Sequence, residues 1–168
     1  VNMSFGDGLM LIGHERTAET HVEDAAGDIA SYFIPNHCQV EEWGVLVTED
    51  FVAQSTDPVV ALQKVDKVGG TVTELDALTI GNSNTKLRKG DGSKVSATAM
   101  AADTELDNGQ VVVANGTPGP IQLRAGEFLR FRHKTAGSVA GGAYRPYAVL
   151  RVAGPALQNT NVWSEKPE

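Results

Sequence analysis

The feature that most constrains this fold is a period-two alternation of apolar and polar residues, which recurs in short stretches along the 168-residue chain. It is clearest within residues 38–48, where the odd-numbered positions from 43 to 47 are large and apolar. That parity holds Trp43, Val45 and Val47, and the other holds Glu42, Gly44 and Leu46. Successive side chains of a β-strand point to opposite faces, so the pattern predicts a strand that buries one face in a core.

Further extended stretches follow, separated by residues that favour turns. Val, Thr and Ile fit a pleated surface, while Gly, Pro and Asn supply turn conformations. The predicted strands are 38–48, 59–65, 71–80, 94–102, 110–114, 121–123, 127–133 and 143–152. Both faces of 143–152 are partly apolar, which predicts a central position in a sheet.

Two of the connections have specific turn signals. The Gly69 and Gly70 pair predicts a turn between 59–65 and 71–80. The Asn108 and Gly109 pair suits a turn with positive φ at both residues, and it predicts a tight hairpin that ends in 110–114.

About eight short strands joined by turns favour an all-β fold, an antiparallel β-sandwich or jelly roll. We expect residues 30–152 to form this domain. The residues expected to point inward are Trp43, Val45, Val47, Leu129, Phe131 and Leu150. Residues 1–29 and 153–168 lack sustained alternation, so we predict extended N- and C-terminal arms that become ordered against neighbouring subunits.

Composition argues against several classes of function. A net charge of −7 and a pI near 5.1 argue against a nucleic-acid groove, which needs concentrated Lys and Arg. The single cysteine, Cys38, allows no intrachain disulfide. The sequence has no apolar run long enough for a membrane-spanning helix, so we expect no membrane partner.

Catalytic motifs fail on their spacing or context. Residues 137–141 (Gly-Ser-Val-Ala-Gly) do not provide a nucleophile elbow between a strand and a helix, and they are better interpreted as a loop. Residues 90–94 (Gly-Asp-Gly-Ser-Lys) lack the spacing of a phosphate-binding loop. We therefore expect no catalytic residues and no cofactor.

Metal binding is a more serious alternative. Asp103, Glu105 and Asp107 resemble the start of a calcium loop, but that loop needs Gly where Asn108 stands and Glu where Ala114 stands. We predict a solvated edge there and leave open a structural calcium ion near Asp103 and Asp107.

Zinc is the other metal considered. The candidate ligands by residue type are His14, His21, His37 and Cys38. His37 and Cys38 are adjacent in a predicted strand and point to opposite faces, so we expect no zinc site.

Apolar and basic residues in polar surroundings suggest protein contacts. Leu9, Leu11 and Ile12 lie in the predicted N-terminal arm, and Trp163 is isolated in the polar C-terminal tail. Arg130 and Arg132 form a basic stripe on one strand of an acidic protein. These six residues are the predicted interface.

Four segments resemble structural proteins of tailed-bacteriophage virions, particularly jelly-roll head decoration (cement) proteins. They are 41–48 (Glu-Glu-Trp-Gly-Val-Leu-Val-Thr) with 57–62 (Asp-Pro-Val-Val-Ala-Leu), the Gly69 and Gly70 turn leading to Thr79 and Ile80, and 121–127 (Ile-Gln-Leu-Arg-Ala-Gly-Glu) before an Arg-Phe-Arg strand.

This resemblance implies a non-enzymatic subunit that is assembled in the host cytoplasm and lies on the capsid surface of the virion. Its expected partners are the major capsid protein and copies of itself, in a trimer or another homo-oligomer. A tail or connector subunit is the nearest alternative. A small-molecule or carbohydrate-binding sandwich is an alternative of another class, although such a site favours clustered aromatic residues and only 6% of this chain is aromatic. A cupin-like metalloenzyme of the same jelly-roll class is a further alternative, but it needs clustered His residues on the strands, whereas His14 and His21 lie in the predicted arm.

Overall fold

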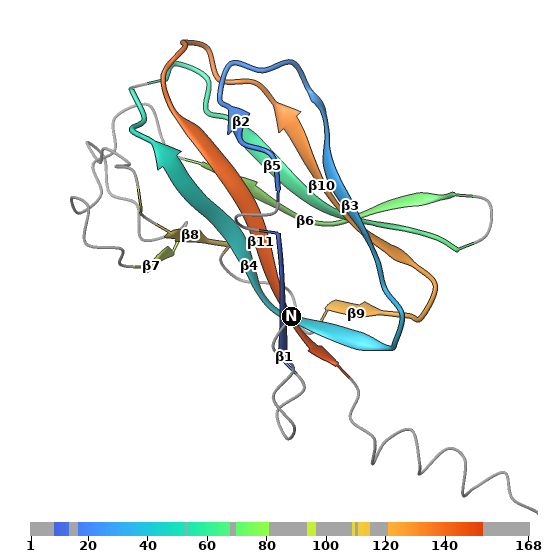
Figure 1. Cartoon of the computed structure of the whole chain (residues 1–168). Coiled ribbons are helices and arrows are strands. Elements are labelled where there is room, and N and C mark those ends of the chain that lie inside the picture. The colour runs from blue at the N-terminus through green and yellow to red at the C-terminus, as the bar shows by residue number, and fades with distance from the viewer. Residues whose placement is uncertain are drawn as a thin grey trace, which may run out of the picture.

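The computed structural model describes residues 9–13, 17–52, 54–67, 70–80, 94–96, 109, 111–114 and 121–152. These residues form two β-sheets that pack face to face, as Figure 1 shows, and no helix occurs among them. The prediction of an all-β sandwich is confirmed.

The larger sheet has seven strands in the order β1-β11-β4-β8-β7, with β2 paired to β11 and β9 paired to β4. Its strands are β1 (Leu9–Gly13), β2 (Thr20–His21), β4 (Cys38–Glu49), β7 (Lys94–Ser96), β8 (Val111–Val113), β9 (Ile121–Leu123) and β11 (Ala143–Val152). β11 lies between β1 and β4, which confirms its predicted central position.

The smaller sheet has four antiparallel strands in the order β3-β10-β5-β6. They are β3 (Gly27–Phe33), β10 (Phe128–Thr135), β5 (Val59–Val65) and β6 (Val72–Thr79). β5 and β6 pair next to the predicted Gly70 turn, where Asp66 N donates to Thr71 O at 2.9 Å. Gly69 lies outside the described residues.

The core lies between the two sheets. All six residues predicted to point inward are buried, with exposures of 1% or less. The largest fully buried side chains are Trp43, Tyr144, Phe131, Ile34, Leu62, Leu78, Ile80, Leu123, Leu129, Leu150 and His133. Trp43 on β4 also links the sheets, because its indole Nε1 donates to Asp76 Oδ2 on β6 at 2.8 Å.

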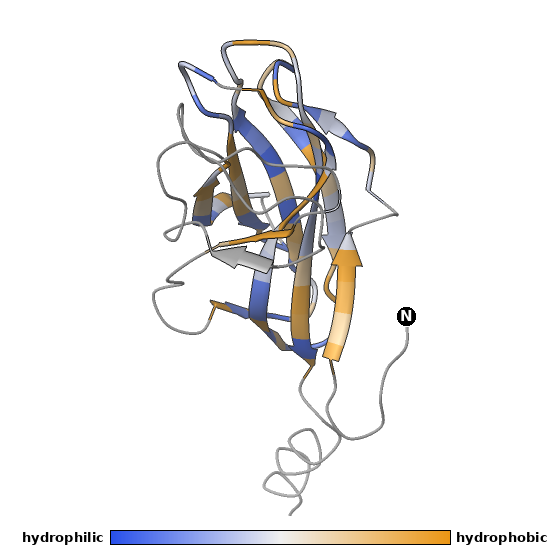
Figure 2. Cartoon of the chain, turned by 90° about the vertical axis from the view of Figure 1, so that its left-hand side faces the viewer, coloured by the Kyte–Doolittle hydropathy of each residue, from blue (hydrophilic) through white to orange (hydrophobic). Residues whose placement is uncertain are grey.

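The described part of residues 1–29 differs from the predicted arm. β1 pairs with β11, β2 pairs with β11, and β3 begins at Gly27 in the smaller sheet. The prediction was wrong here because an edge strand can be held by backbone pairing without strict alternation in its sequence. Figure 2 shows β1 as a hydrophobic strand at the margin of the sheet. The predicted C-terminal arm, 153–168, lies outside the described residues.

The predicted hairpin into 110–114 is also corrected. β7 pairs with β8 in parallel, and parallel strands need a longer crossover than a tight turn. Gly109 does have positive φ, +90°, but its N–H donates to Val47 O on β4 at 2.8 Å. Asn108 lies outside the described residues.

Candidate interaction surface

A line of apolar side chains crosses the outer face of the smaller sheet. Phe128 on β10 is paired with Phe33 on β3 and with Val65 on β5, and Val65 is paired with Val72 on β6. Directly paired residues of neighbouring strands carry their side chains on the same face. Leu129, the next residue along β10, is fully buried, so Phe128 belongs to the outward parity. We call Phe33, Phe128, Val65 and Val72 the phenylalanine row.

Most of the row is open to solvent. Phe33 is 58% exposed, Phe128 is 38% exposed and Val72 is 42% exposed, whereas Val65 is half-buried. The two phenyl rings lie edge to face with centroids 5.5 Å apart. Single exposed apolar residues are ordinary, whereas these four lie side by side across all four strands of the sheet, which makes the row a candidate binding surface.

The outer face next to the row is polar, and its charges pair within the chain. Arg130 Nη1 lies 3.1 Å from Asp28 Oδ2, and Arg132 Nη1 lies 2.7 Å from Asp28 Oδ1. Arg130 also donates from Nε and Nη2 to Gln63 Oε1, at 2.9 and 2.8 Å. The predicted Arg130 and Arg132 therefore point outward but are engaged by neighbouring strands.

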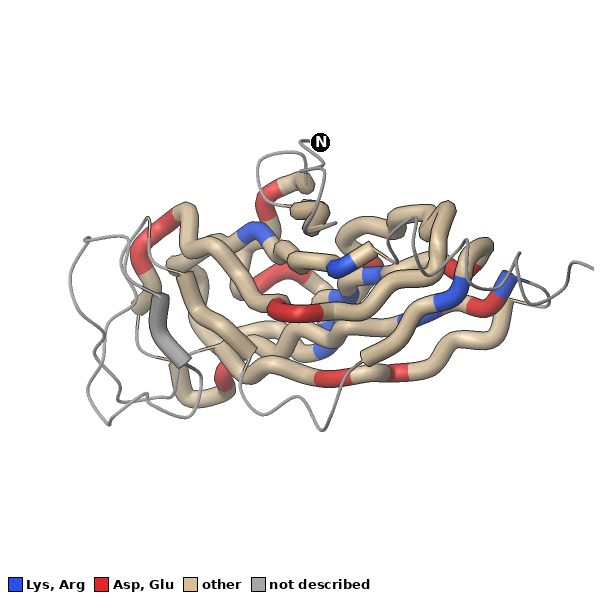
Figure 3. Tube along the Cα trace, turned by 90° about the horizontal axis from the view of Figure 1, so that it is seen from below, with Lys and Arg blue, Asp and Glu red and all other residues tan. Residues whose placement is uncertain are grey.

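Farther along the same face, Lys134 Nζ lies 2.8 Å from Glu74 Oε1. Figure 3 shows acidic and basic positions intermixed over the described part of the chain. Exposed pairs of this kind contribute little stability, but they reduce the charge of these five residues to +1, because Arg130 and Arg132 share Asp28.

The other predicted interface residues are not gathered with these arginines. Leu9, Leu11 and Ile12 lie on β1, at the edge of the other sheet. Leu11 is 54% exposed, whereas Ile12 packs against the core. Trp163 lies outside the described residues.

Sequence reasoning missed Phe33 and Phe128. The signal for Phe128 was present, because it shares its parity with Arg130 and Arg132 and precedes the buried Leu129. The line itself depends on the register between strands that are far apart in the sequence, which alternation within one strand does not specify.

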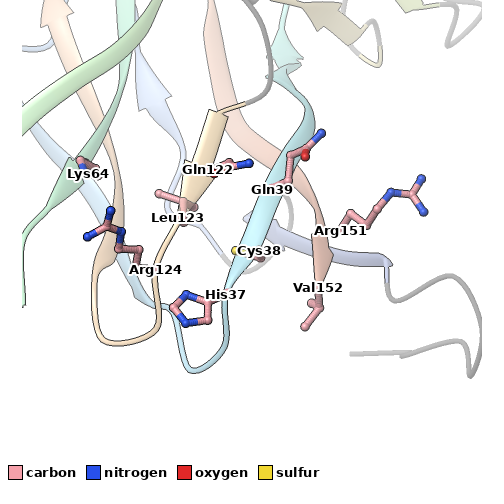
Figure 4. A pocket seen from close by; sticks show the side chains of 9 residues that line it. All are labelled: His37, Cys38, Gln39, Lys64, Gln122, Leu123, Arg124, Arg151 and Val152. Atoms are coloured by element: carbon pink, nitrogen blue, oxygen red, sulfur yellow. The ribbon is translucent and has the colours of Figure 1, made fainter. Parts of the chain in front are cut away.

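A pocket of about 510 Å³ opens at one end of the sandwich (Figure 4). It is lined by His37, Cys38, Gln39, Lys64, Gln122, Leu123, Arg124, Arg151 and Val152. None of these residues is Phe, Tyr or Trp, so the pocket does not offer the aromatic platform expected of a carbohydrate site.

The charges of this pocket are largely balanced by nearby carboxylates. Lys64 Nζ lies 3.2 Å from Glu127 Oε1, and Glu127 Oε2 accepts from the backbone N–H of Arg124 at 2.7 Å. Arg151 Nε donates to Glu41 Oε1 at 2.7 Å. Figure 4 shows the Arg124 and Arg151 side chains pointing to opposite sides, so their charges do not converge on one point.

Cys38 forms part of this pocket but is a poor nucleophile. Burial, with a smaller contribution from the charge of Glu127, raises the pKa of the Cys38 thiol to about 11. The reactive form of cysteine is the thiolate, so the thiol stays protonated and unreactive near neutral pH.

A second group of polar side chains lies deep in the core. His133 Nδ1 and the Tyr144 hydroxyl are hydrogen-bonded to each other, and the two residues are 1% and 0% exposed. Burial lowers the pKa of His133 below its ordinary value, so the ring is held neutral. Such a pair has no access for a substrate, and it stabilises the interior.

The candidate metal ligands are only partly described. His21 lies 3.8 Å from Glu19 and 3.5 Å from Glu49, whereas His14, Asp103 and Asp107 lie outside the described residues. Within the described ranges, no group of three or more His, Cys, Asp or Glu side chains is arranged to hold a metal ion. The same part of the chain contains no helix suited to crossing a membrane.

Comparison of the chain with models of known protein families gives no match, and comparison with curated proteins also gives none. The resemblance to phage structural proteins therefore stays a prediction. Among the described residues, we take the phenylalanine row as the candidate functional surface.

Proposed function

We propose that this chain is a non-enzymatic structural subunit, which works by packing its sandwich against copies of itself or against another protein. The observation that supports this proposal is the phenylalanine row. The exposed fractions of Phe33 and Phe128, 58% and 38%, together equal about one whole phenylalanine. Covering that area, on the order of 200 Å², is worth about 5 kcal/mol before the costs of association.

The more specific form of the proposal is a capsid decoration, or cement, subunit of a tailed bacteriophage. In this form the chain binds the major capsid protein on the head surface and stabilises the head through contacts between subunits. The β-sandwich is compatible with this role, and the resemblance of segments 41–48, 57–62 and 121–127 is what favours it.

The test uses heads of the phage that encodes this chain, produced with its gene deleted. Purified wild-type protein is added back, and binding is measured by cosedimentation and head stability by heat-induced DNA release. A Phe33→Ser/Phe128→Ser variant is compared with Val139→Ser, which changes a loop residue that is 48% exposed.

We expect wild type and Val139→Ser to bind and to raise the temperature of DNA release, and the double variant to lose both effects. Heads that neither bind the wild-type chain nor change in stability would contradict the decoration role. Equal binding by all three proteins would contradict the role of the row.

A further inference from the structure

We infer that the phenylalanine row is the contact surface for a second copy of this chain, related to the first by a two-fold axis. This inference rests on the proposed function and specifies the partner. The row joins two copies, and head binding depends on it because a dimer attaches to the head through two subunits at once. It is carried by the order of side chains along the row and by the pairing of the charges beside it.

The order of the four side chains is self-complementary. Across β3, β10, β5 and β6 the row contains Phe33, Phe128, Val65 and Val72, so two large residues are followed by two small ones. A two-fold axis parallel to the strands, between β10 and β5, reverses the row of the second copy. Phe33 then faces the partner's Val72, and Phe128 faces the partner's Val65.

Such an arrangement matches large side chains with small ones at every position. Well-packed interfaces interdigitate in this way, and a two-fold contact requires one surface to complement itself. Without the reversal, each phenylalanine would face the same phenylalanine of the partner, and each valine would face the same valine.

The polar groups beside the row favour recognition by shape over recognition by charge. Arg130 and Arg132 are paired with Asp28, and Lys134 is paired with Glu74. Because the two arginines share the one carboxylate of Asp28, these five residues keep a net charge of +1, which by itself is a weak basis for selecting a partner of opposite sign. The apolar row is therefore the part of this face that distinguishes one partner from another.

The size of the row sets the strength of the contact. A stable interface usually buries about 800 Å² on each partner, whereas the two phenyl rings expose on the order of 200 Å². The row can form only the centre of such an interface, so we expect a reversible dimer with a dissociation constant in the micromolar range or weaker.

The net charge of −7 supplies an independent signature. Two copies repel each other, and salt screens that repulsion, so self-association should strengthen between about 50 and 300 mM salt. Binding to a partner selected by opposite charge would weaken over the same range.

The experiment is sedimentation velocity of the full chain over a range of protein concentrations, with thermal melting of each variant to check its fold. We expect reversible dimerisation in the wild type and in Val139→Ser. Phe128→Ser should weaken it at least about 30-fold, the effect of removing a central aromatic residue.

A residue swap tests the reversed alignment. Phe128→Val leaves a gap opposite the partner's Val65, and Val65→Phe places two rings against each other, so each single variant should dimerise more weakly. The Phe128→Val/Val65→Phe double variant restores a large residue opposite a small one, and we expect it to regain most of the wild-type affinity.

A wild-type chain that stays monomeric at all concentrations would overturn the inference, and so would a dimer that Phe128→Ser leaves intact. A dimer that the double swap does not restore would overturn the reversed alignment. If the chain is monomeric but row variants still lose head binding, the row contacts another protein. The second-copy inference then fails while the proposed function stands.

Discussion

Replacing Trp43 tests whether the two sheets enclose one continuous core. Trp43 is 1% exposed on β4, and its indole N–H donates to Asp76 on the opposite sheet at 2.8 Å. Truncating a buried Trp to Ala costs about 3–5 kcal/mol, through lost burial and the cavity that remains. For a chain of this size, 1 kcal/mol corresponds to about 2–4 °C in Tm, so Trp43→Ala should lower Tm by roughly 6–20 °C.

The hydrogen bond is separated from the packing by a conservative change. Trp43→Phe keeps most of the ring and removes the donor, and Asp76 is partly open to water, so we expect a loss of only about 1–2 kcal/mol. In a double-mutant cycle with Asp76→Ala, the coupling energy should be about 1 kcal/mol.

The assay is urea denaturation followed by far-UV circular dichroism, with Val139→Ala as a surface control that should change stability by less than about 0.5 kcal/mol. If Trp43→Ala were as stable as that control, the two sheets would not share the core described above. A coupling energy near zero would instead remove the inter-sheet hydrogen bond from the account.

Three further changes probe the interior and the edge of the sandwich. Burial lowers the pKa of His133, so the unfolded chain takes up a proton near pH 6.5 while the folded chain does not. The free energy of unfolding should therefore fall as the pH drops below about 6.5. In urea titrations at several pH values, this free energy should depend less on pH in His133→Gln than in the wild type, and an equal dependence in the two proteins would contradict this. Glu127 is partly desolvated, which raises its pKa, but its bonds to the Arg124 backbone N–H and to Lys64 lower the pKa overall. Glu127→Gln should therefore cost about 1–3 kcal/mol of stability at pH 7. Melting at several pH values should also show that the variant lacks the destabilisation below pH 4.5 that comes from protonating Glu127. A Cβ at Gly44 would lie 2.1 Å from the Val112 carbonyl oxygen. Gly44→Ala should therefore separate β8 from β4 and lower Tm by several degrees. If Tm and amide exchange in β8 were both unchanged, the two strands would not approach this closely.

Much of the fold is predictable from local pattern because alternation is a property of one strand. The stretches 38–48, 59–65 and 143–152 match β4, β5 and β11 at all but one boundary, and their inward residues are buried. The predictions that failed depend on pairing between distant segments. β1 is an edge strand that pairs with β11, and β8 pairs in parallel with β7. Neither arrangement leaves a periodic signal in the sequence.

The candidate surface was predictable only in part. Arg130 and Arg132 were correctly expected on an outward face, but Asp28, which pairs with both, lies more than 100 residues earlier in the chain. The phenylalanine row needs the register of four strands, so it could not be recognised from Phe33 or Phe128 alone.

Hydroxyl-radical footprinting with mass spectrometry tests the central claim most directly, by comparing the free chain with its native assembly. Free in dilute solution, Phe33 and Phe128 should be readily modified because they are 58% and 38% exposed, whereas Phe51, at 8%, should be modified little. Assembly should protect Phe33 and Phe128 and leave the low modification of Phe51 unchanged. If both residues were modified to the same extent in the assembly as in the free chain, the row would not be the contact surface.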